Sequence, residues 1–257
     1  MRAAGRRALV PYLTAGYPAP DATAELLDRL ARAGADVIEL GVPFSDPLAD
    51  GPTIQRASQR ALEQGVTLRW TLDALTAFRA DHDTPVVLFT YLNPLLAYGG
   101  ERFVDDALAC GADGVLVTDL PLGGDPDLER TLAASRLSLI RLIAPTTTPD
   151  RALAIAAEAQ GFVYYISRTG VTGARAELRR GLTEEVMRLR GAAGVPIAVG
   201  FGISTPEQAA EVARVADGVV VGSALIDALD RGGADAAESF IRRLRAAIDE
   251  AAPAAGE

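Results

Sequence analysis

Hydrophobic residues along the chain form short continuous runs that alternate with longer stretches in which apolar residues recur every three or four positions. The short runs are rich in Val, Ile and Leu, as is typical of parallel strands buried on both faces. The longer stretches predict amphipathic helices, the first of which is capped by Asp21 and ends at Gly34. We predict about eight strands, each followed by a helical stretch, at residues 8–14, 37–40, 86–90, 114–117, 137–143, 162–166, 196–199 and 219–221.

A repeated boundary between helix and strand supports this organisation. Small residues and an aspartate precede three of the predicted strands, in Ala35–Asp36, Gly111–Asp113 and Ala216–Asp217. This recurrence marks repeated βα units, and about eight of them in a chain of 257 residues suit a TIM (β/α)8 barrel. The alternative is a doubly wound open sheet, which requires a glycine-rich phosphate turn after the first strand. Thr14–Pro18 fits that turn poorly.

Composition narrows the classes of function. The net charge of -9 argues against nucleic-acid binding, which requires basic patches. No apolar run approaches membrane-spanning length, and we see no signal peptide. The single cysteine, Cys110, excludes an intrachain disulfide and fits a reducing compartment, so we expect a cytoplasmic protein. No linker divides the chain, and we predict one domain over residues 1–257 with a frayed tail at about 252–257.

Missing residue types limit the chemistry further. The chain contains no lysine, which excludes a Schiff-base aldolase and a pyridoxal phosphate enzyme because both need a lysine amine. One cysteine and one histidine leave no Cys/His metal site, and we expect no bound metal. We interpret the histidine, His82, as a solvated residue at a helix end. Carboxylates, tyrosines and backbone amides remain available for catalysis.

The stretch around the second predicted strand carries the strongest chemical signal. Glu39 lies on the strand Val37–Leu40, and the following loop is rich in Gly and Pro and contains Asp46 and Asp50. Glycine lets a loop approach a ligand closely, and proline stiffens it. An acid on a buried strand beside such a loop suits a pair of proton-handling carboxylates. The alternatives are an ion pair between Glu39 and an arginine, and an ordinary turn at Asp50.

Glycines after the last two predicted strands indicate a phosphate site. Gly202 follows the seventh strand, and Gly222 and Ser223 follow the eighth, each just before a helical stretch. Barrel enzymes often bind phosphate there, where glycine amides and helix N-termini face the anion. Ser204–Glu207 matches a capping box at the start of one of these helices. The alternative is that the glycines only permit tight turns.

The sixth predicted strand and its loop add further candidates. The loop at residues 167–180 is long and polar, as in loops that close over substrates, although it fits a solvated connector as well. Its Gly173 is a candidate for another amide at the phosphate site. Tyr164 on the strand, together with Tyr12 on the first strand, is expected to point into the barrel. Core packing is the alternative for both tyrosines.

Taken in order and spacing, these motifs resemble the tryptophan synthase alpha chain family over nearly the whole chain. The resemblance lies in five segments, Pro11–Pro18, Ile38–Gln55, Tyr164–Ala174, Gly200–Glu207 and Gly222–Ala224. The segment from Ile38 to Gln55 is highly specific for that family, whereas the phosphate motifs occur in other phosphate-binding barrels. Tyr12 departs from the family, in which phenylalanine is common at this position. The seven or so residues before the first strand also depart from it, because members usually carry a short helix there.

The resemblance implies retro-aldol cleavage of indole-3-glycerol phosphate to indole and glyceraldehyde 3-phosphate. Glu39 would be the acid and base, and Asp50 would bind the indole N–H as a carboxylate. Tyr164 would orient Glu39 or the substrate, and Tyr12 would pack against the indole ring. The phosphate would be held by Gly173, Gly202, Gly222 and Ser223.

The resemblance also implies a partner. The family works with a pyridoxal phosphate beta chain that uses the indole to make L-tryptophan, typically in an α2β2 complex. No cofactor is then expected on this chain, and pyridoxal phosphate is expected only on the beta subunit. Residues 52–55 and Asp119–Pro121 would face that partner. Competing hypotheses are a stand-alone lyase, a phosphate-substrate barrel enzyme with different chemistry, and a mainly non-catalytic activator of a beta subunit.

Overall fold

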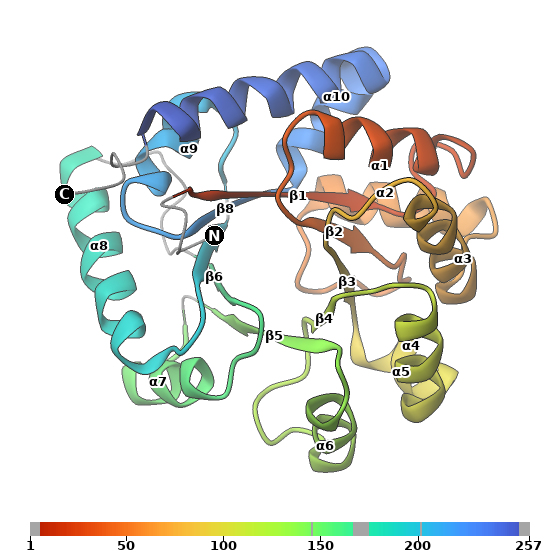
Figure 1. Ribbon diagram of the computed structural model, residues 1–257, viewed down its shortest axis with the longest axis horizontal. Coiled ribbons are helices and arrows are strands. Elements are labelled where there is room, and N and C mark those ends of the chain that lie inside the picture. The colour runs from red at the N-terminus through yellow and green to blue at the C-terminus, as the bar shows by residue number, and fades with distance from the viewer. Residues whose placement is uncertain (1–5, 145, 167–174, 201, 252–257) are drawn as a thin grey trace.

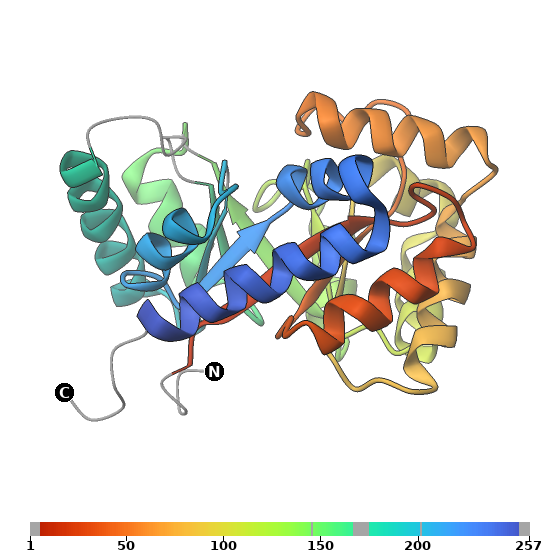
Figure 2. The same cartoon turned by 90° about the horizontal axis from the view of Figure 1, so that it is seen from above.

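The computed structural model of the protein describes residues 6–144, 146–166, 175–200 and 202–251, and the side chains within 175–180 are outside the description. Eight parallel strands pair in chain order and close into a barrel. The strands lie at the centre and the helices surround them (Figures 1 and 2). The predicted single TIM (β/α)8 barrel is therefore confirmed. The expected frayed tail lies outside the described residues.

The strands alternate with helices along the chain. The strands are β1 (Ala8–Thr14), β2 (Ile38–Gly41), β3 (Val86–Thr90), β4 (Gly114–Val117), β5 (Ser138–Ile143), β6 (Val163–Ile166), β7 (Ile197–Gly200) and β8 (Gly218–Val221). The helices are α1 (Ala22–Arg32), α2 (Pro52–Glu63), α3 (Leu68–Arg79), α4 (Leu92–Tyr98), α5 (Gly100–Ala109), α6 (Pro126–Ala134), α7 (Pro149–Ala157), α8 (Arg175–Ala192), α9 (Pro206–Ala213) and α10 (Ser223–Ala251). Each predicted strand agrees with an observed one to within one residue at either end.

Two hydrophobic layers follow from the alternation of side chains along each strand. On β2, Ile38 and Leu40 point outward into the large core between strands and helices. Residues of the opposite face fill the barrel interior, where Val10, Val87 and Val220 pack together. A residue one position away from an outward-facing one therefore points into the barrel.

The aspartates of the repeated helix–strand boundary share one structural role. Asp36, Asp113 and Asp217 each accept a backbone N–H at the beginning of a neighbouring strand, from Leu9 (2.8 Å), Val86 (2.8 Å) and Ile197 (3.0 Å). Each also pairs with an arginine, as in Arg245–Asp36 (2.7 Å), Arg79–Asp113 (2.5 Å) and Arg190–Asp217 (3.0 Å). The repeat thus marks the amino-terminal end of the barrel, where it satisfies otherwise unpaired strand amides.

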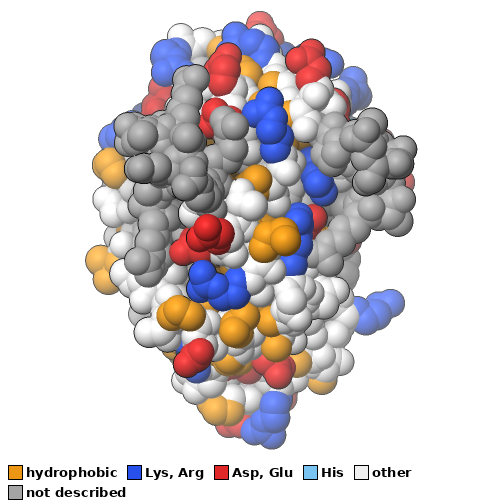
Figure 3. Space-filling model, turned by 90° about the vertical axis from the view of Figure 1, so that its left-hand side faces the viewer, with side chains coloured by type: hydrophobic (Ala, Val, Ile, Leu, Met, Phe, Trp, Pro, Cys, Tyr) orange, Lys and Arg blue, Asp and Glu red, His pale blue; other side chains and the backbone are white. Residues whose placement is uncertain are grey.

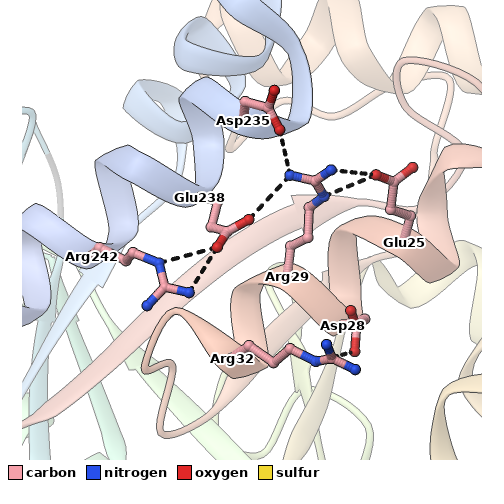
Figure 4. A network of polar contacts seen from close by, with 7 residues as sticks. All are labelled: Glu25, Asp28, Arg29, Arg32, Asp235, Glu238 and Arg242. Carbon is pink, nitrogen blue, oxygen red and sulfur yellow. Dashed lines mark hydrogen bonds and ion pairs between the residues drawn. The ribbon is translucent and has the colours of Figure 1, made fainter.

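Arginine networks also join helices that are far apart in the chain. Arg29 of α1 contacts Glu25 on its own helix at 2.8 Å, and Asp235 and Glu238 of α10 at 2.6 and 3.1 Å. Glu238 is shared with Arg242 at 2.8 Å (Figure 4). These contacts fasten α10 to α1 across the outside of β1.

Three local predictions were wrong. Asp21 is the residue before α1, but its side chain makes no capping hydrogen bond. The capping box at α9 consists of Thr205 and Gln208 instead of Ser204 and Glu207, because the helix begins one residue later than the pattern indicated. His82 is not solvated, since its ring stacks on Phe78 with centroids 4.6 Å apart and its Nε2 lies 2.7 Å from Asp28.

Charged side chains of both signs occur on the surface, as expected from a sequence that contains many arginines and many acidic residues. On the face towards α8, described arginine and acidic side chains are interspersed among uncharged ones (Figure 3). None of the described helices is both long enough and apolar enough to cross a bilayer.

Candidate active site

Glu39 lies inside the barrel because its neighbours Ile38 and Leu40 point outward. Its exposure is 1%, and neither carboxyl oxygen has a hydrogen-bond partner among the residues that the structure describes. No arginine among the described residues pairs with it, so the alternative of a buried ion pair finds no support in that part of the chain. A buried polar group without a partner is costly, and water or a bound molecule that donates a hydrogen bond would satisfy it.

Burial also sets the protonation state of Glu39. It raises the pKa of this carboxyl from its ordinary value to about 8, because the charged form loses its hydration. At neutral pH, Glu39 therefore carries a proton and can act as an acid.

Asp50 occupies a different environment, in the loop after β2. Its Oδ2 accepts a hydrogen bond of 3.0 Å from the hydroxyl of Tyr91, which in turn accepts one of 3.0 Å from the amide of Ala49. Burial raises the pKa of Asp50 to about 6, and the Tyr91 bond opposes that rise. Asp50 is thus ionised at neutral pH while Glu39 is not. Asp50 also closes a turn through its amide, which donates to the carbonyl of Pro47 at 3.0 Å, but a turn alone does not account for the half-buried carboxylate bonded to Tyr91.

Tyr12 and Tyr164 both lean over a glycine of the next strand. The Oη of Tyr12 lies 2.1 Å from the position that a Cβ on Gly41 would take, and the Oη of Tyr164 lies 2.5 Å from that position on Gly200. Any larger residue at either glycine would collide with the phenol. Tyr12 is 4% exposed, with its ring edge-on to Phe89 at 5.1 Å, and Tyr164 packs against the interior cluster. Both tyrosines therefore point into the barrel, as predicted.

The predicted phosphate residues lie at the carboxyl ends of β7 and β8. Gly202 has a φ of 72°, a left-handed conformation that favours glycine. Ser223 is the first residue of α10, so the amides of Ser223 and Ala224 lack intrahelical acceptors, whereas the amide of Leu225 donates to the carbonyl of Gly222. Gly222 precedes it, and a Cβ added to Gly222 would lie in van der Waals contact with Tyr12. Gly173 and residues 167–174 of the predicted loop lie outside the described residues, so the role of Gly173 stays a prediction. The prediction that the loop extends to residue 180 was wrong, because α8 begins at Arg175.

Sequence reasoning missed two residues of this site, Tyr91 and Gly41. Tyr91 directly follows β3, and the carboxyl ends of barrel strands are where catalytic residues gather, so its position was a usable signal. Gly41 had no such signal, because its need for glycine depends on the ring of Tyr12 across the strand pair. Among the described residues, no group of three or more His, Cys, Asp or Glu side chains is arranged to hold a metal ion.

Comparison with known proteins agrees with this geometry. The family profile described as tryptophan synthase alpha chain matches residues 1–255. The chain belongs to the tryptophan synthase alpha chain family. It is 50% identical over 253 residues to the alpha chain of Chloroflexus aurantiacus, covering 96% of this chain and 95% of that relative. It is 51% identical over 233 residues to that of Acidiphilium cryptum, covering 90% and 84%.

Solved structures of the family share the fold. The alpha subunit from Legionella pneumophila superposes with a TM-score of 0.88 at 38% identity, covering 97% of this chain and 95% of that one. An aminoacrylate-bound tryptophan synthase from M. tuberculosis gives a TM-score of 0.87 at 38% identity, covering 96% and 95%. The function expected from the sequence is therefore that of the alpha chain, cleavage of indole-3-glycerol phosphate to indole and glyceraldehyde 3-phosphate, a carbon–carbon lyase reaction in tryptophan biosynthesis.

Proposed function

We propose that Glu39 and Asp50 carry out the cleavage of indole-3-glycerol phosphate in this chain. Glu39 donates its proton to C3 of the indole ring, which makes that ring a cation. The bond between C3 and the glycerol carbon then breaks, and its electron pair returns to the ring. Glu39, now a carboxylate, takes the proton of the hydroxyl on that carbon, which becomes the aldehyde. Proton and electrons balance, and Glu39 ends the cycle protonated.

Asp50 acts on the other end of the ring system. As a carboxylate it accepts a hydrogen bond from the indole N–H and stabilises the positive charge that appears on the ring after protonation. The hydrogen bond from Tyr91 holds this carboxylate in place and favours its ionised form. A protonated Glu39 and an ionised Asp50 give the acid and the anion that the reaction needs at the same pH.

The remaining proposed roles concern binding. Gly202, Gly222 and Ser223 bind the phosphate through backbone amides and the start of α10, with Gly173 as a further amide donor. Tyr164 orients Glu39 or the substrate. Tyr12 packs against the indole.

The observation that carries this proposal is the carboxyl group of Glu39, buried to 1% exposure with no hydrogen-bond partner in the described part of the chain. A purely structural carboxyl at that depth would be paired. The substrate supplies the partners that the protein leaves out.

The proposal extends to a beta chain that consumes the indole. Leu48, in the loop after β2, is 91% exposed, and Leu96 of α4 is 50% exposed. Beside Leu48, a groove of about 550 Å³ runs between this loop and α2 and includes Phe44 and Arg56. Exposed apolar side chains beside a groove are typical of a docking surface. We assign Pro52 to Gln55 and Asp119 to Pro121 to the same interface, in an α2β2 complex.

The proposed chemistry uses carboxyl groups alone, so no cofactor is required on this chain and pyridoxal phosphate belongs to the beta subunit. The lone buried cysteine, Cys110, suits a cytoplasmic protein.

The test is indole release by the Glu39→Gln variant, measured on the purified chain alone and with a beta subunit. We expect a loss of about 1,000-fold or more, because general acid–base catalysis contributes about 10²- to 10⁴-fold and Glu39 acts twice in the cycle. Binding of glyceraldehyde 3-phosphate, measured by calorimetry, should stay unchanged. Glu250→Gln, on the exposed end of α10, is the matched control. Turnover by Glu39→Gln close to that of the control would refute the proposal.

A further inference from the structure

The hydroxyl of Tyr12 occupies a defined position beside Glu39. Strands β1 and β2 pair with Tyr12 opposite Glu39, so both side chains project into the barrel from neighbouring strands. The phenol leans towards β2 and ends over Gly41, the next inward-facing position after Glu39. Tyr164 ends over Gly200 on β7, and the charge of Glu39 also raises the pKa of its hydroxyl. Of these two phenols, only Tyr12 thus reaches over the strand that carries Glu39.

The hydrogen bonding of Tyr12 leaves its own proton available. Its oxygen accepts a hydrogen bond of 3.3 Å from the hydroxyl of Thr14. Within the described part of the chain, no acceptor is bonded to the Tyr12 proton. A hydroxyl that accepts one hydrogen bond becomes a stronger donor of its own. The contact with Phe89 and the space left by Gly41 fix the direction of the ring.

The charged and titratable groups around Tyr12 are few. Glu39 faces it from β2, Asp50 from the loop after β2, and Tyr164 and Tyr91 lie nearby. Burial, with the negative charges of Asp50 and Glu39, holds the pKa of Tyr12 far above its usual range. Tyr12 therefore stays a neutral donor throughout the working pH range. Asp50 already accepts from Tyr91, whereas no described residue donates to Glu39.

We propose that the hydroxyl of Tyr12 donates a hydrogen bond to the carboxylate of Glu39 once Glu39 has given its proton to the substrate. This inference rests on the proposed acid role of Glu39. A buried carboxylate without a donor is unfavourable, so a donor that is already oriented lowers the energy of the ionised stage of the cycle. Tyr12 is then a positioning residue that acts through Glu39, beyond the packing role of its ring.

The first test needs no substrate. Carboxyl ¹³C NMR follows the titration of Glu39 in the free protein, with Glu39→Gln identifying the signal. In Tyr12→Phe the midpoint should move up by about one pH unit relative to wild type, because loss of the donor disfavours the ionised form. Tyr165→Phe is the matched control, since its buried hydroxyl contacts Glu185 on the outer side of the barrel. An unmoved or lowered midpoint in Tyr12→Phe overturns the inference.

The second test uses the reaction. Tyr12→Phe keeps the ring, so KM should change little while kcat falls about 10- to 100-fold, the range for a hydrogen bond to a charged group. The high-pH limb of the rate profile should move up with the NMR midpoint. Loss of kcat without movement of the limb contradicts the inference, since the hydroxyl would then act on another group.

A further variant tests the same hydroxyl in case Tyr12→Phe does not fold. Gly41→Ala forces the hydroxyl away because the new Cβ would lie 2.1 Å from it, and it should also raise the Glu39 midpoint. If the wild-type chain releases no indole, the proposed function fails, yet the NMR titration still decides whether Tyr12 serves Glu39.

Discussion

At the scale of single residues, the site depends on a difference between two carboxyl groups. Glu39 has no hydrogen-bond partner among the described residues, and burial raises its pKa to about 8, whereas Asp50 is bonded to Tyr91 and has a pKa of about 6. Between about pH 6 and about pH 8, Glu39 is protonated and Asp50 is ionised. Their different environments thus give two chemically identical carboxyl groups opposite protonation states and opposite roles.

The unpaired state of Glu39 has a consequence for stability. Its pKa is raised on folding, so the native state holds a proton that the unfolded chain releases above about pH 4.5. Stability is therefore lost as pH rises towards about 8. Glu39→Gln removes this loss, and its free energy of unfolding relative to wild type should rise by a few kcal/mol across that range, on the order set by the pKa shift.

Urea denaturation at several pH values measures this difference. A constant difference between wild type and Glu39→Gln from acid to alkaline pH would mean that Glu39 titrates normally in the folded protein.

Tyr91 provides a second prediction at this scale. Its hydrogen bond lowers the pKa of Asp50, so Tyr91→Phe should raise that pKa above about 6. Since the reaction needs Asp50 ionised, the low-pH limb of indole release should move to higher pH. The rate profile of the variant measures this shift, and a limb that moves to lower pH would show that Tyr91 does not favour the carboxylate.

At single positions, the sequence predicted the placement of a side chain where one element decides it. Glu39 stood out because an acid interrupts a short apolar strand beside a stiff loop. Tyr91 and Gly41 were missed because their roles arise from contacts between strands, with Asp50 and with Tyr12.

At the scale of elements, strand positions were predictable because short continuous apolar runs bounded by Gly and Asp are too brief to form buried helices. Helix starts were less predictable. The capping box of α9 was displaced by one residue because Ser204, Thr205 and Gln208 share one set of hydrogen bonds, and sequence cannot say which residue leads the helix. The amide and the arginine that pair with each boundary aspartate were likewise not predictable, because they depend on how the strands pair.

Asp217 tests the structural role of those aspartates. It is 4% exposed, accepts from the amide of Ile197 and pairs with Arg7 and Arg190. Asp217→Ala should lower the free energy of unfolding by about 3 kcal/mol, since it leaves buried partners unsatisfied. Urea denaturation measures this, with the exposed Asp73→Ala as the control.

Activity separates this effect from a role in catalysis. Asp217 lies at the amino-terminal end of the barrel, away from the site, so kcat per folded molecule should stay at the wild-type value. A fall in kcat without a fall in stability would contradict the structural role.

At the scale of the whole molecule, closure of the barrel brings distant segments together. Tyr12 of β1, Glu39 of β2 and Tyr164 of β6 all project into one interior, and Gly222 after β8 lies next to Tyr12. The sequence predicted a barrel and its catalytic end, because βα units and strand-end motifs repeat. It did not predict which side chains meet inside, because that depends on strand register.

Above all, we propose that Glu39 works as a protonated acid and Asp50 as an ionised partner in the same reaction. The pH dependence of kcat/KM for indole release by the wild-type chain, from about pH 5 to about pH 9, tests it most directly. We expect a bell-shaped profile in which kcat/KM rises near pH 6 as Asp50 ionises and falls near pH 8 as Glu39 loses its proton. A flat profile over that range, or one that rises through pH 8, would contradict it.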